Sequence, residues 1–247
     1  MSELRIAVPK GRLQDRVLAL FAEAGYDTPT EIELRSRRLV FQSAGVEWIF
    51  VKDCDVPVYV EHGAADAGVA GLDQILEHQC TAYQPVEFSF GRCRMMVIGA
   101  PSAPRLSEAI NAKVATKYPR ITRQYLERNG VRAEIVPLGV SVELAAVLNL
   151  TSHVVDLVET GETVRIHRLE MQDLVAEISP RLIVGRGIYR TEPARMRDLI
   201  ARVEKVCHSE RGEEPGSVAA RGSSLPPSAH SGPSLTLGMT PGKERRS

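Results

Sequence analysis

The chain has 247 residues, and its 31 basic and 31 acidic side chains give a formal net charge of zero. This balance excludes a protein that binds nucleic acid by bulk neutralisation of phosphates, although a local basic pocket for a small anion remains compatible with it. No apolar run approaches the roughly 18 residues of a membrane-spanning helix, and we expect no secretory signal. The four cysteines form no C-x-x-C pair, which predicts reduced thiols, no zinc site and a cytoplasmic protein.

Strand and helix patterns alternate along the first 91 residues. Leu4–Val8 predicts a short strand, and apolar spacing over residues 13–24 predicts a helix that ends at Gly25. Two strands joined by a turn are then expected at residues 39–41 and 48–51, and a short helix from Asp55. A buried strand is expected at 67–70, and another helix from Leu72.

The same alternation continues from residue 92 onward. Strands are expected at residues 93–100, 114–115, 133–136, 154–158 and 174–178, and helices at 121–129, at 142–150 with Ser141 as N-cap, and at 196–206. Continuous apolar strands that alternate with helices predict an α/β fold with mostly parallel sheets.

We expect two lobes, because residues 89–92 are suited to a crossover. Lobe I comprises residues 1–91 plus about 179–208, and lobe II comprises residues 92–178. Ligands of such folds bind in the cleft between the lobes.

The last 39 residues, 209–247, differ in composition from the rest. Eight are Ser, six are Gly and five are Pro, and none is Phe, Trp, Tyr or Ile. Such a segment has too little apolar surface to offset the entropy cost of ordering it. We therefore expect a disordered tail after a folded body of 208 residues, which is long enough to bury a core.

The most informative segment is VVDLVETGETVR, residues 154–165. Its apolar strand carries Asp156, and the loop that follows offers the hydroxyls of Thr160 and Thr163, while Gly161 lets backbone amides approach a ligand. A strand-end acid beside such a loop suits a sugar hydroxyl next to a phosphate. The alternative is a turn followed by a solvated helix start, and Glu162 counts against phosphate binding unless it points to solvent.

Basic side chains follow the first strand as well. Lys10 and Arg12 flank Gly11 at a strand end, where α/β folds place anion sites. Lys10 can act as a point charge and Arg12 can bind bidentately. An exposed, solvated basic loop is the alternative.

Other candidate residues carry weaker signals. In the segment of small residues 63–73, Gly71 and Asp73 stand at the start of a helix, where a carboxylate suits the helix dipole, and tight packing with a cap is the alternative. A further basic group comprises Arg35, Arg37, Arg38 and, nearby in sequence, Lys52. The six histidines are isolated, so we expect no metal ligands among them.

Six segments, taken in order, resemble the ATP phosphoribosyltransferase family in its short form. They are IAVPKGRL, RRLVF, DVPVYVEHGAADAGVAGLD, ATKYP, GVSVEL and VVDLVETGETV, and they span residues 6–164. The resemblance as a whole covers residues 4 to about 206 and implies two lobes like those of type II periplasmic binding proteins. It also implies the first step of histidine biosynthesis, in which ATP and phosphoribosyl pyrophosphate (PRPP) react with Mg²⁺ on the pyrophosphate.

The resemblance also implies roles for particular residues. Its T-G-x-T loop would hold the 5-phosphate, Asp156 would face the ribose hydroxyls, and the cations would lie near pyrophosphate and triphosphate. Lys52 stands where family members often have Arg, and its ammonium acts as a point charge without the bidentate fork of a guanidinium. We assign catalysis to Lys10, Arg12, Arg37 and Lys52, and substrate binding to Asp156, Glu159, Thr160, Gly161, Glu162, Thr163, Gly71 and Asp73.

Short-form members resemble subunits that need a partner like a catalytically inactive histidyl-tRNA synthetase. Since only 39 residues, rich in Ser, Gly and Pro, follow His208, we expect such a partner in a hetero-oligomer and no intrinsic histidine site. Two alternatives stay open: a non-catalytic bilobal module that binds a small anion, and a phosphoribosyltransferase for another base. Glu143 either assists the adenine amino group or only starts its helix.

Overall fold

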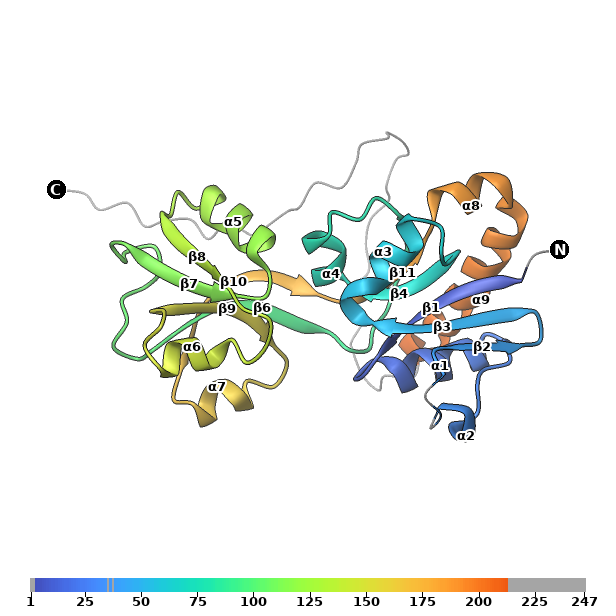
Figure 1. Ribbon diagram of the computed structural model, residues 1–247, viewed down its shortest axis with the longest axis horizontal. Coiled ribbons are helices and arrows are strands. Elements are labelled where there is room, and N and C mark those ends of the chain that lie inside the picture. The colour runs from blue at the N-terminus through green and yellow to red at the C-terminus, as the bar shows by residue number, and fades with distance from the viewer. Residues whose placement is uncertain (1–2, 35, 37, 213–247) are drawn as a thin grey trace. The chain divides into compact units, whose positions relative to one another are not determined.

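Two mixed β-sheets organise the part of the chain that the computed structural model describes, residues 3–34, 36 and 38–212 (Figure 1). The first sheet has the order β2-β3-β1-β4-β11-β5, with strands at Val40–Ser43, Val46–Lys52, Leu4–Lys10, Ala67–Gly71, Pro180–Val184 and Tyr83–Glu87. The second has the order β10-β6-β9-β7-β8, with strands at Glu170–Ile178, Cys93–Gly99, His153–Val158, Ala112–Thr116 and Ala133–Pro137.

Helices cover both sheets. Those next to the first sheet are α1 (Gln14–Glu23), α2 (Glu31–Leu34), α3 (Val56–Glu61), α4 (Leu72–Glu77), α8 (Arg186–Thr191) and α9 (Pro193–Gly212), and a 3-10 turn at Asp53–Asp55 precedes α3. Those next to the second are α5 (Pro119–Arg128), α6 (Glu143–Val147) and α7 (Glu162–Ile166), with α5 on one face and α6 and α7 on the other (Figure 1). No helix of the described residues is long and apolar enough to cross a membrane.

The alternation of side chains along β1 shows how the first sheet fills two cores. Ile6 and Val8 are fully buried in the core that includes Phe21 and Trp48, and Ala7 is buried on the opposite face with Val56 of α3. Successive side chains of a strand point to opposite faces, so an uninterrupted apolar strand requires cover on both.

The chain passes between the sheets at two places. β5 of the first sheet ends at Glu87 and β6 of the second begins at Cys93; β10 then ends at Ile178 and β11 begins at Pro180. The intervening Ser179 is buried, and its carbonyl accepts the N–H of Leu72 at 2.9 Å. The start of α4 is thus fixed to the second crossing.

The expectation of mostly parallel sheets is wrong. Among the described strands, four pairings are parallel and five are antiparallel. At the edge of the first sheet, Ala44 and Gly45 both have positive φ and join β2 to β3 in a two-residue turn, which imposes antiparallel pairing. The apolar pattern identifies strands, but their direction depends on how the chain enters the sheet.

Local predictions differ from the structure at several places, and α2, β11 and α8 were not expected at all. β5 was not expected, because its sequence YQPVE contains Pro85 and only Val86 is buried. The helix predicted from 142 with Ser141 as N-cap begins at Glu143, and its N-cap, Val142, makes no side-chain capping bond. α9 continues to Gly212, into the stretch predicted as a tail, and the rest of that prediction, residues 213–247, lies outside the described residues.

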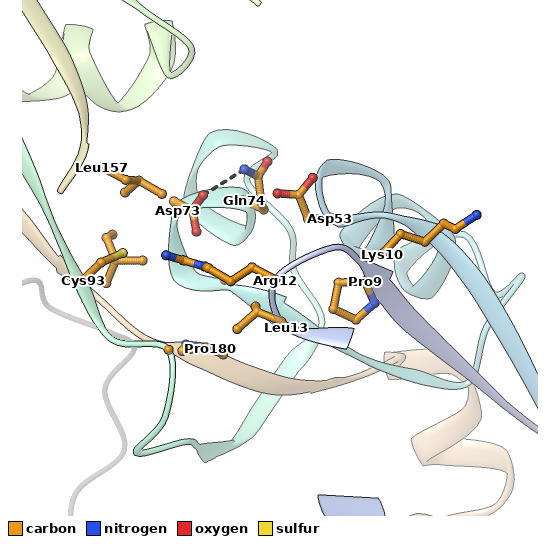
Figure 2. Close-up of a pocket in the computed structure, with 13 residues that line it drawn as sticks. Pro9, Lys10, Arg12, Leu13, Asp53, Asp73, Gln74, Cys93, Leu157 and Pro180 are labelled. Atoms are coloured by element: carbon orange, nitrogen blue, oxygen red, sulfur yellow. Dashed lines mark hydrogen bonds between the residues drawn. The ribbon is translucent and has the colours of Figure 1, made fainter. Parts of the chain in front are cut away.

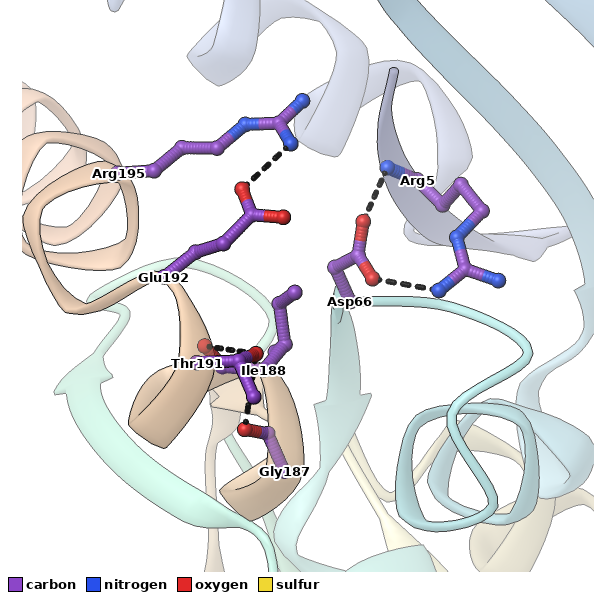
Figure 3. A network of polar contacts seen from close by, with 7 residues as sticks. All are labelled: Arg5, Asp66, Gly187, Ile188, Thr191, Glu192 and Arg195. Atoms are coloured by element: carbon purple, nitrogen blue, oxygen red, sulfur yellow. Dashed lines mark hydrogen bonds and ion pairs between the residues drawn. The ribbon is translucent and has the colours of Figure 1, made fainter. Parts of the chain in front are cut away.

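One buried carboxylate fixes β4 against β1 at their amino ends (Figure 3). Asp66 accepts the backbone N–H of Arg5 at 2.9 Å and its guanidinium at 2.7 Å, and the Asp66 N–H donates to the Arg5 carbonyl at 2.8 Å. β1 and β4 are parallel, so their carboxyl ends, at Lys10 and Gly71, meet at the opposite edge of the sheet.

Candidate active site

A small pocket lies where the carboxyl ends of β1 and β4 face the second sheet (Figure 2). We call it the inner pocket; its lining is Pro9, Lys10, Arg12, Leu13, Asp53, Gly71, Asp73, Gln74, Gly91, Cys93, Leu157, Ile178 and Pro180. Its volume of about 80 Å³ is well below the roughly 300 Å³ at which ligand pockets begin. It therefore accommodates only part of a substrate.

A larger cavity of about 430 Å³ surrounds the predicted phosphate loop. We call it the loop pocket; its lining is Arg12, Asp53, Lys117, Tyr118, Asp156, Leu157, Val158, Glu159, Thr160, Gly161, Glu162, Thr163 and Val164. Arg12, Asp53 and Leu157 line both pockets. All six residues predicted from the segment 154–165 therefore lie in one cavity together with one predicted cation.

The loop has its shape because one residue adopts a left-handed conformation. Gly161 has φ of 77° and precedes α7, whose first residue is Glu162. The Glu162 N–H donates to the Thr160 hydroxyl at 3.3 Å, so the turn is closed locally. Glu162 lines the loop pocket, but it is exposed, so solvent screens its charge.

Asp156 is the half-buried acid of the loop pocket. Burial raises the pKa of its carboxyl, while the ammonium of Lys117 and the N–H of Leu157 lower it. Lys117 Nζ lies 3.6 Å from Asp156 Oδ2, and the Leu157 N–H donates to Oδ1 at 2.8 Å. The charge of Glu143, in the first turn of α6, raises the same pKa. The pKa of Asp156 thus depends on a balance between burial and one partly exposed lysine.

An ion pair joins the first-sheet cations to the loop. The guanidinium of Arg12 pairs with the carboxylate of Glu159, and both side chains are about half exposed, at 53% and 48%. In Figure 2 the Arg12 side chain points into the inner pocket toward Cys93 and Asp73. A bound anion can replace Glu159 as the partner of Arg12 without uncovering a buried charge.

Asp73 is buried at the start of α4, and Gly71 makes room for it. A Cβ atom at Gly71 would come within 2.1 Å of Asp73 Oδ1. The carboxylate accepts Gln74 Nε2–H at 2.8 Å and the hydroxyl of Tyr118. Burial raises the pKa of Asp73, against the effect of these hydrogen bonds. Burial and the nearby carboxylate of Asp73 also raise the pKa of Tyr118.

The other predicted cations are not gathered in the pockets. Lys10 lines the inner pocket, but its side chain points away from Arg12 (Figure 2). Lys52 is exposed at the end of β3, in register with Lys10, and lines neither pocket. Arg37 lies outside the described residues.

Lys117 and Tyr118 were not assigned to the site from the sequence. β7 pairs with β9 so that Thr116 stands opposite Val155, which places Lys117 beside Asp156. Both residues belong to the ATKYP segment, which carried the family resemblance, but nothing in their spacing indicates a neighbour almost 40 residues away. The parallel pairing of β7 and β9 brings them together.

No group of three or more His, Cys, Asp or Glu side chains in the described part of the chain is arranged to hold a metal ion. Mg²⁺ is ordinarily bound by one or two carboxylates together with substrate phosphates and water. The exposed carboxylate of Asp53, which lines both pockets, suits that lighter kind of coordination.

Known proteins resemble this chain over most of its length. The sequence model of the family described as HisG, ATP phosphoribosyltransferase, matches residues 52–205. An ATP phosphoribosyltransferase of Sorangium cellulosum (strain So ce56) is 43% identical over 207 residues, which are 81% of this chain and 94% of that protein. In the solved ATP phosphoribosyl transferase (HisG:HisZ) complex from Thermotoga maritima, a chain aligns with a TM-score of 0.74 and 30% identity, covering 83% of this chain and 99% of that one.

A more distant likeness concerns the fold alone. The crystal structure of Tv2483 bound to L-arginine aligns with a TM-score of 0.54 at 12% identity and covers 85% of each chain. The expected α/β fold, of the type II periplasmic-binding-protein kind, is confirmed. Because one fold serves unrelated functions, the family match carries the functional conclusion and this likeness does not.

Proposed function

The chain belongs to the ATP phosphoribosyltransferase family, and on that premise we propose that its loop pocket binds the phosphoribosyl group of PRPP. The chain is a glycosyltransferase and catalyses the first step of histidine biosynthesis, in which ATP receives the phosphoribosyl group and pyrophosphate leaves. The observation that carries the site proposal is the enclosure of Asp156 and the whole loop, residues 159–163, in one cavity with Arg12.

The loop binds the 5-phosphate of PRPP. Thr160 and Thr163 supply hydroxyl donors at the edge of the cavity, and Gly161 lets the backbone turn so that the amides at the start of α7 are accessible. The side chains of Glu159 and Glu162 are exposed to solvent, and Glu159 releases Arg12 when the substrate arrives.

Asp156 accepts hydrogen bonds from the ribose hydroxyls. One of its oxygens already accepts the Leu157 N–H, while the other faces Lys117 at 3.6 Å, which is longer than a hydrogen bond, so this oxygen can still accept a hydroxyl. An ionised carboxylate accepts hydrogen bonds at both oxygens, and Lys117 favours that form.

We call Lys10, Arg12 and Lys52, together with Gly71 and Asp73, the first-sheet wall of the site; it binds the anionic parts of both substrates. Arg12 contacts the pyrophosphate, and Lys10 and Lys52 raise the positive potential at the same strand ends. The catalytic role assigned to Arg37 rests on the family resemblance alone, because this residue lies outside the described residues. Gly71 and Asp73 shape the inner pocket on the nucleotide side. The adenine nitrogen attacks ribose C1 while pyrophosphate leaves, so positioning and charge stabilisation account for the rate without a covalent nucleophile.

Asp53, which lines both pockets, is the carboxylate that would hold Mg²⁺ together with the substrate oxygens. A bound Mg²⁺ would supply positive charge to the leaving pyrophosphate.

A second, regulatory subunit completes the enzyme. The Thermotoga maritima relative was solved as a HisG:HisZ complex, and we expect a histidyl-tRNA-synthetase-like partner for this chain as well. The free cysteines fit the reducing cytoplasm.

The test is a coupled assay with ATP, PRPP and Mg²⁺, with and without the regulatory subunit. Absorbance from the phosphoribosyl-ATP product should rise, most strongly in the complex. The non-catalytic binding module predicts PRPP binding by calorimetry without product, and that result in a verified complex would overturn the assignment.

A further inference from the structure

Glu77, the last residue of α4, caps a helix that belongs to the other sheet. Its carboxylate accepts the backbone N–H of Arg120 at 3.0 and 3.1 Å and that of Ile121 at 3.1 Å. α5 needs such a partner, because Tyr118 at its N-cap provides no side-chain bond and Pro119 has no N–H. A carboxylate at a helix N-terminus also interacts favourably with the helix dipole.

This contact joins the two sheets beside the site. α4 directly follows β4 of the first sheet, while α5 begins three residues after β7 of the second. Leu72 and Leu76 of α4 pack against the core of the second sheet, and Asp73 holds the hydroxyl of Tyr118. α4 therefore contacts the start of α5 as well as the core of the second sheet.

The residues just before α5 belong to the wall of the loop pocket. Lys117 and Tyr118 line that pocket, and Lys117 is the cation that faces Asp156. Because Glu77 fixes the amides of the two residues after Pro119, its loss would free the backbone that carries this wall. Glu77 itself lines neither pocket, so it acts only through these residues.

We propose that Glu77 is a positioning residue for the phosphoribosyl transfer. By capping α5 it holds Lys117 and Tyr118 against the loop pocket and keeps α4 closed over the inner pocket. The kinetic part of this inference rests on the proposed function, whereas the closure of the inner pocket does not.

The kinetic test compares Glu77→Ala and Glu77→Gln with a matched variant, Glu61→Ala. The Glu61 carboxylate also accepts a backbone N–H, that of Thr81 at 3.0 Å, and the Thr81 hydroxyl at 2.6 Å, but it lies at the end of α3 and lines neither pocket. In the complex we expect Glu77→Ala to raise the KM for PRPP about fivefold to tenfold, with kcat changed less than threefold.

Glu77→Gln keeps one acceptor and should fall between parent and Glu77→Ala, and Glu61→Ala should leave the KM for PRPP unchanged. A KM for PRPP that is unchanged in Glu77→Ala, in a complex that is active, overturns the positioning role.

The second readout needs no activity. Cys93 is buried and lines the inner pocket, so its alkylation by N-ethylmaleimide, followed by peptide mass spectrometry, reports how often that pocket opens. We expect alkylation of Cys93 in the full chain to be at least fivefold faster in Glu77→Ala and unchanged in Glu61→Ala. Cys207, which is buried in the core of the first sheet, is the internal reference.

The two measurements distinguish a failure of the role proposed for Glu77 from a failure of the transferase assignment. Unchanged Cys93 alkylation in Glu77→Ala overturns the proposal whatever the kinetics show. Faster alkylation in a complex that makes no phosphoribosyl-ATP supports the closure by Glu77 and counts only against the transferase assignment.

Discussion

The two walls of the site are built differently. The first-sheet wall offers Arg12, about half exposed and paired with Glu159, and Lys10, exposed and turned aside. The second-sheet wall offers a carboxylate, Asp156, that is only 16% exposed, next to a turn closed by Gly161. On the proposed function, the first-sheet wall attracts anions and adjusts to them, whereas the second-sheet wall positions a sugar phosphate in a fixed geometry.

The largest effect is expected at the first-sheet wall. Arg12→Ala removes a bidentate contact to pyrophosphate, and we expect kcat/KM to fall about 100-fold, which corresponds to about 2.7 kcal/mol. The melting temperature should hardly change, because the Arg12–Glu159 pair is exposed.

The control for Arg12 is Arg16→Ala. Arg16 is exposed and lies over the ring of Phe90, with its guanidinium carbon 5.4 Å from the ring centroid, and it lines neither pocket. Equal losses in the two variants would show that Arg12 contributes only through the general charge of this wall.

The next effect concerns the buried part of the first-sheet wall. In Gly71→Ala the new Cβ would displace the Asp73 carboxylate from Gln74 and Tyr118. We expect the free energy of unfolding to fall by about 2 kcal/mol and the melting temperature by roughly 4–8 °C. Gly139→Ala is the control, since nothing lies within 4 Å of its added Cβ. A melting temperature of Gly71→Ala within 1 °C of the control would refute the role given to Gly71.

The variant Asp156→Asn tests the second-sheet wall. We expect the KM for PRPP to rise about tenfold, since the amide replaces an acceptor by a donor toward the ribose hydroxyls. Stability at neutral pH should be kept or increased, because the variant removes a charge that burial disfavours. Asp198→Asn, which alters an exposed ion pair with Arg202 on α9, should leave the KM for PRPP unchanged.

The pH dependence of Asp156→Asn has a defined sign. The pKa of Asp156 is raised in the folded state above its ordinary 3.8, so the native protein binds this proton more tightly than the unfolded chain does. The free energy of unfolding of the parent, minus that of the variant, should therefore fall as pH rises from below 3.8 through the raised value. Urea unfolding of both proteins across this range measures the difference, and a rise would mean that Lys117 outweighs burial.

The smallest effect is expected from one hydroxyl of the loop. Thr163→Ala removes a single hydrogen bond to the 5-phosphate, so the KM for PRPP should rise about fivefold, near 1 kcal/mol. Thr191→Ala on α8, whose hydroxyl donates to the Gly187 carbonyl at 3.3 Å, should leave kinetics unchanged. Steady-state kinetics in which both variants match the parent would remove Thr163 from the site.

The elements were predictable from sequence where the chain is buried on both sides. β1, β4 and β9 are nearly continuous apolar runs, and their apolar periodicity predicts them. β5 has one buried residue and a proline, so neither alternation nor apolarity predicts it, and it exists because β11 offers an edge to pair with. Local pattern fails where a neighbouring strand supplies the stability.

The candidate site divides in the same way. Asp156, Thr160, Gly161 and Thr163 lie within eight residues of one another in the sequence. One strand–turn–helix unit therefore carries them all, and the motif could be predicted. Lys117 joins Asp156 only through the pairing of β7 with β9, which no local spacing predicts.

By itself the sequence determined that this is an α/β protein of the ATP phosphoribosyltransferase family and predicted the loop at 159–163, because these features depend on neighbours along the chain. Only the tertiary structure decided the directions of strands far apart in sequence, the approach of Arg12 to Glu159, and the capping of α5 by Glu77. The two side-chain contacts join residues 147 and 43 positions apart, and their energies exist only after the intervening chain has folded.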